Sequence, residues 1–169
     1  MSFNTLPLKL GQVSTSASLA GILGQAFRVD DPDGVLGTRV FVLVKAGASL
    51  SSPSRKTVVS ALDATSKQPT WVVDTSTTAS ASCAMVIPTD YGSTTIASGA
   101  YFLAQAKGVA EVISAAAIAA GVAIGCSTTA GKCDDASIVG AGILGNSLES
   151  AAGADENVAV ILTGGSVGV

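Results

Sequence analysis

The chain has 169 residues, which is enough for one domain with a hydrophobic core. Its composition is apolar, with 48% hydrophobic and only 12% charged residues, and it contains no histidine. The net charge of −3 argues against nucleic-acid binding, which needs a basic face, and the lack of histidine removes the commonest general base and metal ligand.

The apolar residues do not form a membrane span. The longest apolar run, Val112 to Cys126, is 15 residues long, whereas a helix that crosses a bilayer needs about 18 or more. The first residues, MSFNTLPLKLGQ, lack the basic and apolar regions of a secretory signal. We therefore expect a soluble protein, made in a cytoplasm. A soluble chain with so few charges exposes large apolar patches, which predicts a subunit that buries surface in an assembly.

Residues 1–26 are rich in Ser, Gly, Leu and Ala and have little periodicity. We interpret them as an N-terminal arm or a first strand, followed by a single β-rich domain over residues 27–169. The sequence Asp31-Pro32-Asp33-Gly34 then predicts a turn, because Pro presets φ and Gly supplies a positive φ.

Short β-rich segments follow at intervals of 8 to 15 residues. Low-complexity Thr75–Ser82, Asp90–Ser93 and Ala152–Asp155 are predicted loops or turns, and Ala106-Lys107-Gly108 is predicted to be a hairpin turn. Ala115–Ala120 contains strong helix formers but is too short for more than one helical turn. The predicted strands are Arg39–Lys45, Thr57–Leu62, Thr70–Asp74, Ala84–Pro88, Gly99–Gln105, Val109–Ser114, Val122–Cys126, Ile138–Asn146, Leu148–Ser150 and Asn157–Thr163.

This rhythm is typical of an all-β protein. We predict a mainly β fold, a compact β-sandwich or barrel with at most one or two short helices and an N-terminal arm.

The stretch GCSTTAGKC, Gly125 to Cys133, resembles a phosphate-binding loop at first sight. Such a loop needs four residues between its glycines and a hydroxyl residue after its lysine. Here five residues lie between Gly125 and Gly131, and Cys133 follows Lys132. We interpret the stretch as a hairpin turn between two strands.

The chain has three cysteines, Cys83, Cys126 and Cys133, and no CxxC pair. A zinc site would need four ligands with local pairs, so the spacing does not favour one. Facing strand positions would allow a disulfide between Cys126 and Cys133, but nothing points to an oxidising compartment. Reduced, mostly buried thiols are the favoured interpretation, with the disulfide as the alternative.

The other candidate sites lack residues that their motifs require. Asp30 to Gly34 resembles half of a calcium loop, but Val40 stands where the loop needs Glu. Hydroxyl nucleophiles lack a histidine partner, and Ser54-Arg55-Lys56 is too sparse for nucleic acid. Trp71 is interpreted as a core or interface anchor. We predict no catalytic, cofactor-binding or metal-binding residues, no cofactor, and no enzyme activity.

The C-terminal half contains an ordered series of short motifs: an aromatic strand with a Gln, an AAG step, a T-x-G-K turn and a closing LG segment. The residues of these motifs are Tyr101, Phe102, Gln105 and Gly108; Ala119, Ala120 and Gly121; Thr129, Gly131 and Lys132; and Leu144, Gly145, Leu148, Ala151 and Asp155. In this order and spacing, residues 35–163 resemble the head decoration (cement) proteins and small capsid-associated proteins of tailed bacteriophages, most strongly after residue 99. Ser147 stands where the family pattern more often has Ala.

The resemblance implies a β-tulip-like domain that forms homotrimers on the capsid surface of a virion. It implies that the major capsid protein is the partner, that neighbouring capsomers are locked together, and that nucleic acid and membrane are not contacted. An arm within residues 1–26 would lie across capsid protein or a neighbour. Three alternatives stay open: another virion β-module such as a fibre or tail component, a non-viral surface or shell protein, and a small hydrolase with an unusual site.

Overall fold

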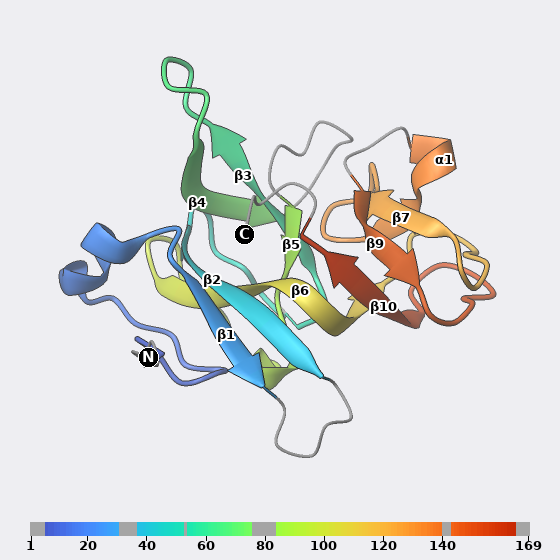
Figure 1. The fold of residues 1–169 in the computed structure, drawn as a ribbon, viewed down its shortest axis with the longest axis horizontal. Coiled ribbons are helices and arrows are strands. Elements are labelled where there is room, and N and C mark those ends of the chain that lie inside the picture. Colours follow the sequence, from blue (N-terminus) through green and yellow to red (C-terminus); the bar gives the residue numbers. More distant parts are fainter. Residues whose placement is uncertain (1–5, 31–36, 53, 76–83, 140–142, 165–169) are drawn as a thin grey trace.

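The computed structural model describes residues 6–30, 37–52, 54–75, 84–139 and 143–164. These residues form ten strands and three short helical segments, so the predicted mainly β fold is confirmed (Figure 1). The helical segments are η1 (Ala17–Ile22), η2 (Thr89–Tyr91) and α1 (Ala136–Val139). The strands are β1 (Ala26–Asp30), β2 (Thr38–Ala46), β3 (Thr57–Leu62), β4 (Pro69–Thr75), β5 (Ala84–Val86), β6 (Tyr101–Ile113), β7 (Ala123–Cys126), β8 (Cys133–Asp135), β9 (Ile143–Ser147) and β10 (Asn157–Thr163).

Five of these strands close into a barrel. The strand order is β1-β2-β4-β3-β5-β6-β10-β9-β7-β8, and β2 also pairs with β6, so β2, β4, β3, β5 and β6 form a ring. The pairing of β2 with β4 is parallel and short, and the other pairs in the ring are antiparallel. A barrel with a closed ring removes the free sheet edges that otherwise invite aggregation.

Side-chain direction alternates along β2 and the first half of β6, which decides which of their side chains fill the barrel. The even-numbered residues that lie in the barrel core, beside Met85 and Tyr91 from other segments, are Val42, Val44, Ala46, Phe102, Ala104 and Ala106. The odd-numbered residues Phe41, Leu43, Tyr101 and Leu103 form a separate cluster on the outer face. This period of two is what a strand with both faces buried requires.

The N-terminal segment covers that outer face. Leu8 is buried in the outer cluster, and partly buried Leu6, Leu10, Leu19, Ile22 and Leu23 pack against it. Backbone hydrogen bonds join Ser14 to Tyr101 in both directions, at 2.7 and 3.1 Å. The residues interpreted as an arm or first strand thus lie on the chain's own barrel from residue 6 to residue 24, and β1 follows them.

The C-terminal half of the chain adds a second lobe, which Figure 1 shows beside the barrel. Strand β6 leaves the barrel, continues to Ile113 and pairs with β10, which leads through β9 and β7 to β8. The core of this lobe holds Val112, Ile124, Val158, Val160 and Leu162, and it is joined by Ala84 and Val86 of β5. We call residues 6–107 the barrel lobe and residues 108–164 the C-terminal lobe.

The predicted hairpin turn at Ala106–Gly108 is wrong. Residues 101–113 form one continuous strand, and Gly108 has a φ of 90° within it. A Cβ at Gly108 would lie 2.6 Å from the backbone oxygen of Thr38, so glycine here permits a close approach between strands rather than a turn. The register between β2 and β6 shifts at this point, which marks a β-bulge.

Other predicted boundaries need smaller corrections. Residues 136–139, part of them in the predicted strand Ile138–Asn146, form α1, and β9 begins at Ile143. Leu148–Ser150 is not a strand, and Ala115–Ala120 forms no helix because Ile118 exchanges backbone hydrogen bonds with Ala151 instead. No strand is predicted at β1. The turn at Asp31–Gly34, almost all of the loop at Thr75–Ser82 and the thiol of Cys83 lie outside the described residues.

Candidate functional site

The stretch GCSTTAGKC forms the β7–β8 hairpin, as predicted. Cys126 and Cys133 are paired across the two strands, and the turn between them has Gly131 at a φ of 75°. The amide of Ser127 donates to the Lys132 oxygen at 2.9 Å, and the amide of Lys132 donates to the Thr129 oxygen at 3.1 Å. A phosphate loop must aim its amides at the ligand, and here these amides close the turn.

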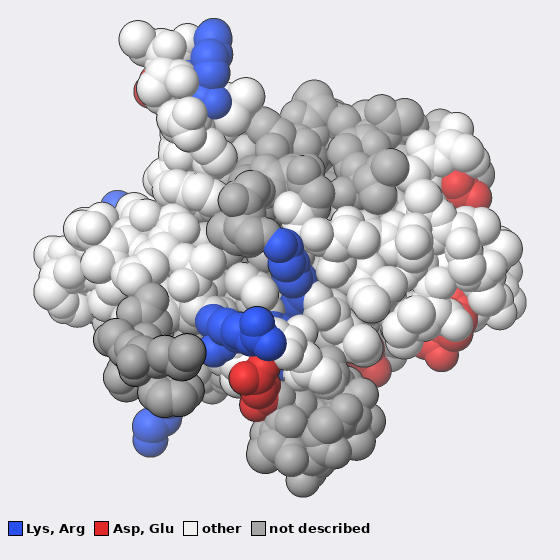
Figure 2. All heavy atoms as spheres, viewed as in Figure 1, with Lys and Arg blue, Asp and Glu red and all other residues white. Residues whose placement is uncertain are grey.

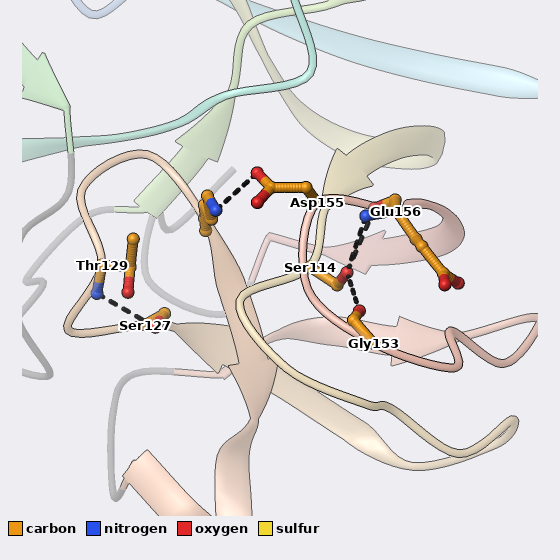
Figure 3. Close-up of polar contacts among 7 residues, drawn as sticks. Ser114, Ser127, Thr129, Gly153, Asp155 and Glu156 are labelled. Atoms are coloured by element: carbon orange, nitrogen blue, oxygen red, sulfur yellow. Dashed lines mark hydrogen bonds and ion pairs between the residues drawn. The ribbon is translucent and has the colours of Figure 1, made fainter.

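The same hairpin connects the two lobes. Thr57 in β3 donates its amide to the Gly131 oxygen at 3.0 Å and its hydroxyl to the Lys132 oxygen at 3.2 Å. The Lys132 ammonium pairs with the Asp155 carboxylate at 2.6 Å. Figure 3 shows Asp155, with its ion pair as a dashed line, near the turn that holds Ser127 and Thr129. Lys132 is therefore a structural residue that joins the hairpin to the 152–156 turn.

Both described cysteines are completely buried, and neither belongs to a disulfide, although Cys126 and Cys133 face each other in the hairpin. Burial raises the pKa of the Cys133 thiol to about 12, and the nearby Asp134 carboxylate adds to the rise. The thiolate is the reactive form of cysteine, so the Cys133 thiol is unreactive at neutral pH.

Two buried serine hydroxyls in the C-terminal lobe are structural as well. Ser114 donates its hydroxyl to the Gly153 oxygen at 2.7 Å and accepts the Glu156 amide at 3.1 Å (Figure 3). Ser147 donates to the Ala119 oxygen at 2.7 Å and accepts the Val122 amide at 3.1 Å. Each hydroxyl satisfies loop backbone groups that burial would leave unpaired, which is a structural use of serine rather than a catalytic one.

The described residues contain no group of three or more metal-ligating side chains. They also contain no helix that is long and apolar enough to cross a membrane. Trp71, interpreted as a core or interface anchor, is partly buried and packs against the barrel core. Its φ of 58° is in the left-handed region, and its amide donates to the Ser60 hydroxyl at 2.8 Å.

A cavity of about 440 Å³ lies where β6 passes from the barrel to the C-terminal lobe. Its lining combines polar and apolar side chains. We call it the interlobe pocket; its lining residues are Arg39, Arg55, Pro88, Thr89, Gln105, Val109, Ala110, Glu111 and Ala159.

Two arginines dominate the chemistry of the interlobe pocket. The Arg55 Nε donates to a Glu111 carboxylate oxygen at 2.6 Å. The Arg39 guanidinium lies over the ring of Phe41, with its carbon 5.3 Å from the ring centre, and one of its terminal nitrogens is 3.8 Å from the Asp90 carboxylate. Gln105 is almost fully buried, and its amide donates to the Lys107 and Val109 oxygens, which fixes the bulge beside the pocket.

Four large apolar side chains are exposed among the described residues, two in each lobe. Leu62 and Val72, on β3 and β4, are 44% and 41% exposed. Leu148 and Ile161, after β9 and on β10, are 52% and 42% exposed. We call these places the β3–β4 apolar surface and the β9–β10 apolar surface. They belong to different lobes, and the β3–β4 hairpin projects from the body of the molecule in Figure 1.

Charge is sparse and unevenly divided along the chain. Residues 1–107 carry eight Lys or Arg and six Asp or Glu, whereas residues 108–169 carry one and six. The face in Figure 2 is mostly uncharged, and acidic groups mark the side formed by the C-terminal lobe. The resulting net charges, +2 for the first part and −5 for the second, give the two lobes opposite sign.

Sequence reasoning missed the interlobe pocket. Arg39, Arg55 and Glu111 are far apart in the chain, and no local motif links them. Arg55 and Lys56, neighbours in a basic cluster too sparse for nucleic acid, diverge: the Lys56 ammonium donates to the Ser51 oxygen at 2.7 Å, while Arg55 enters the pocket. Arg39, Arg55 and Glu111 come together only when β2, β6 and the segment before β3 pack beside one another in the fold.

Comparison with solved structures finds a similarity to the crystal structure of the N base of the head fibre protein gp8.5 of bacteriophage phi29, at 13% sequence identity and a TM-score of 0.42. The match covers 75% of this chain and 96% of that chain. No family model matches the sequence, and no curated protein matches it.

Proposed function

We propose that this chain is a non-enzymatic structural protein of a tailed-bacteriophage virion, which binds the outer capsid surface and bridges neighbouring capsomers. The resemblance of residues 35–163 to head decoration proteins motivates the proposal. The major capsid protein is then the partner, the chain acts as a homotrimer, and neither nucleic acid nor membrane is bound. The acidic C-terminal lobe suits a protein that stays away from packaged nucleic acid.

The observation that carries the proposal is the presence of two separate apolar surfaces. A bridging protein needs at least two contact areas that can be occupied at once, and exposed large apolar side chains mark such areas. The β3–β4 and β9–β10 apolar surfaces lie on different lobes of one molecule. Strand β6 runs through both lobes and holds them together.

The N-terminal segment enters this proposal in a limited way. Residues 6–24 cover the outer cluster of Phe41, Leu43, Tyr101 and Leu103. Removal of the first 20 residues would therefore expose the chain's own barrel as well as remove any contact with capsid protein. Substitutions on the two apolar surfaces separate binding from folding more cleanly than this deletion.

The test mixes purified protein with undecorated heads assembled from the major capsid protein of the same genome. We expect the protein to co-sediment with the heads and to raise the temperature at which the heads disassemble. A Leu62→Ser, Val72→Thr variant and a Leu148→Ser, Ile161→Thr variant should each bind at least roughly tenfold more weakly, because each loses apolar burial. Thr95→Ser, at an exposed position between η2 and β6 and away from both apolar surfaces and the N-terminal segment, is the control and should bind like the wild type.

The results separate bridging from simple attachment. Bridging predicts that a variant with one altered surface protects the heads less than wild type even at concentrations where its occupancy is equal. If both altered variants bind and protect like wild type, these surfaces are not the contacts. If the wild-type protein does not co-sediment with the heads at all, the proposed function is wrong. Light scattering of the free protein checks the expected mass of three copies.

A further inference from the structure

We propose that the interlobe pocket binds a carboxylate group, held by the guanidinium groups of Arg39 and Arg55, and that Glu111 is the internal carboxylate with which such a ligand competes. This proposal is independent of the virion role. It is based on the size and position of the pocket, on the hydrogen bonding and conformation of the two arginines, and on the position of Glu111.

The size and position of the pocket suit a small ligand or one or two side chains of a peptide. Its volume of about 440 Å³ falls within the range of roughly 300–1,000 Å³ that ligand pockets occupy. Such pockets tend to lie at junctions between structural units, and this one lies between the lobes. Pro88, Val109 and Ala159 supply apolar walls, while two guanidiniums and the Thr89 side chain supply polar groups.

Arg39 has an unused donor. Its Nε is buried and has no hydrogen-bond partner among the described residues. Buried donors are almost always paired, so an unpaired one requires an explanation such as a missing acceptor. The contact with Phe41 holds the guanidinium in place, and the distance of 3.8 Å to Asp90 is too long for a hydrogen bond.

Arg55 is held in an unusual conformation. Its φ is 66°, in the left-handed region that non-glycine residues rarely adopt, and its amide donates to the Ile87 oxygen at 3.0 Å. Backbone strain of this kind is retained only where the surroundings fix it, and it concentrates at functional positions. The Arg55 guanidinium lines the pocket and pairs there with Glu111.

The ion pair of Arg55 with Glu111 shows what the pocket accepts. A single hydrogen bond, from Nε at 2.6 Å, joins them, and the side chains are 37% and 45% exposed. Arginine forms its strongest pairs with carboxylates through two parallel hydrogen bonds, which this pair does not use. Arg39 and Arg55 are balanced by Glu111 and Asp90, so an external carboxylate binds best when the Glu111 side chain moves aside.

The experiment is a titration of the full chain, followed by the NMR signals of the arginine Nε–H groups. The probe is N-acetyl-Ala-Glu-Ala-amide, and the matched neutral probe is N-acetyl-Ala-Gln-Ala-amide. Sodium acetate tests a free carboxylate, and inorganic phosphate tests a general anion. We expect the glutamate peptide to shift the Arg39 and Arg55 signals to saturation, with a dissociation constant on the order of 1 mM.

Four variants complete the test. Glu111→Gln should bind the glutamate peptide roughly tenfold more tightly, because the competing charge is gone. Arg55→Gln and Arg39→Gln should bind it at least roughly tenfold more weakly. Arg28→Gln removes a surface arginine that is paired with Asp30 outside the pocket, and it should bind like the wild type.

Several results would overturn the proposal. These are a lack of saturable shifts with the glutamate peptide and acetate, equal shifts with the glutamine peptide, stronger binding of phosphate than of either carboxylate, or unchanged affinity in Glu111→Gln. Saturation by acetate as well as by the peptide assigns the site to free carboxylates, whereas saturation by the peptide alone assigns it to an acidic side chain of a protein. The increase expected for Glu111→Gln keeps the test valid even if Arg39→Gln fails to fold.

Discussion

The cores of the two lobes differ in the side chains that fill them. Every aromatic residue of the chain lies before residue 108, and the barrel core contains Phe102 and Tyr91 in edge-to-face contact, with ring centres 5.9 Å apart. The C-terminal lobe packs aliphatic side chains and two thiols, and it buries the hydroxyls of Ser114 and Ser147 against loop backbone. Aromatic rings bury more area per residue than small aliphatic side chains do. The C-terminal lobe, which has no aromatic side chain, fixes its loops with hydrogen bonds from buried hydroxyls.

The largest effect should come from removing an aromatic ring from the barrel. Phe102→Ala should lower the free energy of unfolding by about 3–5 kcal/mol, and Ile124→Ala in the C-terminal lobe by about 2–5 kcal/mol. The chain contains its own probes for both lobes. Trp71 reports on the barrel, and the thiols of Cys126 and Cys133 report on the other lobe when labelling is done in a Cys83→Ser background.

Urea titrations with both probes test whether the lobes unfold together. We expect the fluorescence and thiol-labelling transitions to coincide in the wild type and in both variants, because β6 belongs to both sheets. Two separated transitions, with each variant moving only its own, would show that the lobes are independent.

Alkaline pH should weaken both lobes, each through one buried group. Burial raises the pKa of Tyr91 to about 12, against an ordinary value of 10.0, and that of Cys133 to about 12, against 9.0. A raised pKa in the folded state means that the neutral form is favoured there. Stability is therefore fully present below the unfolded pKa and is lost as the pH rises toward 12. A tenfold difference in proton affinity between the folded and unfolded states corresponds to about 1.4 kcal/mol.

The losses of stability due to Cys133 and to Tyr91 can be told apart by the pH at which each begins. The loss assigned to Cys133 should begin near pH 9.0 and that assigned to Tyr91 near pH 10.0. Cys133→Ala should remove the first part of the decline in the free energy of unfolding, and Tyr91→Phe the second. A decline that is identical in the wild type and in both variants would assign the alkaline loss to other groups.

The glycine at the junction tests how closely the lobes are joined. Gly108→Ala should cost about 1–3 kcal/mol or more, since a Cβ there would meet the Thr38 oxygen at 2.6 Å and φ is 90°. Gly121→Ala is the matched control: φ is 80°, but no atom lies within 4 Å of the added Cβ. The difference between the two variants in thermal unfolding measures the effect of the close approach alone. Equal losses would mean that only the backbone conformation matters.

The smallest effect should come from the ion pair between Lys132 and Asp155. The carboxylate is 75% exposed, so Lys132→Met should change the free energy of unfolding by about 0–1 kcal/mol. The change should shrink further in about 1 M salt, which a denaturation series at two salt concentrations checks. A loss above about 2 kcal/mol would show that the hairpin depends on this pair more than an exposed ion pair allows.

The strands that the sequence predicts well are those with unambiguous local chemistry. Thr57–Leu62 matches β3 residue for residue, because β-branched residues stand between a proline and a polar turn. The prediction divides β6 in two because Gly108 looks like a turn residue, and only its contact with Thr38 shows the other use of glycine. The helix α1 is not predicted for a different reason, because four residues are too few to show helical periodicity.

The candidate sites also differ in whether they are formed by neighbouring or by distant residues of the sequence. The hairpin at Gly125–Cys133 could be predicted, since turn chemistry is local. The interlobe pocket could not be predicted, because Arg39 and Glu111 are 72 positions apart and come to line the same cavity only through the pairing of β2, β6 and β10. The burial of hydroxyls such as that of Ser147 could not be predicted from the sequence either, because serine is most often a surface residue.

The long strand β6 also determines the order in which the chain can fold as it is synthesised. Its first half pairs with β2, which has already been made, so the barrel ring can close soon after residue 113 leaves the ribosome. Its second half must wait for β10, which begins at Asn157. During that interval the nascent chain carries an unpaired strand edge with Val109, Val112 and Ile113 on it, so the period of greatest risk for aggregation falls late in translation.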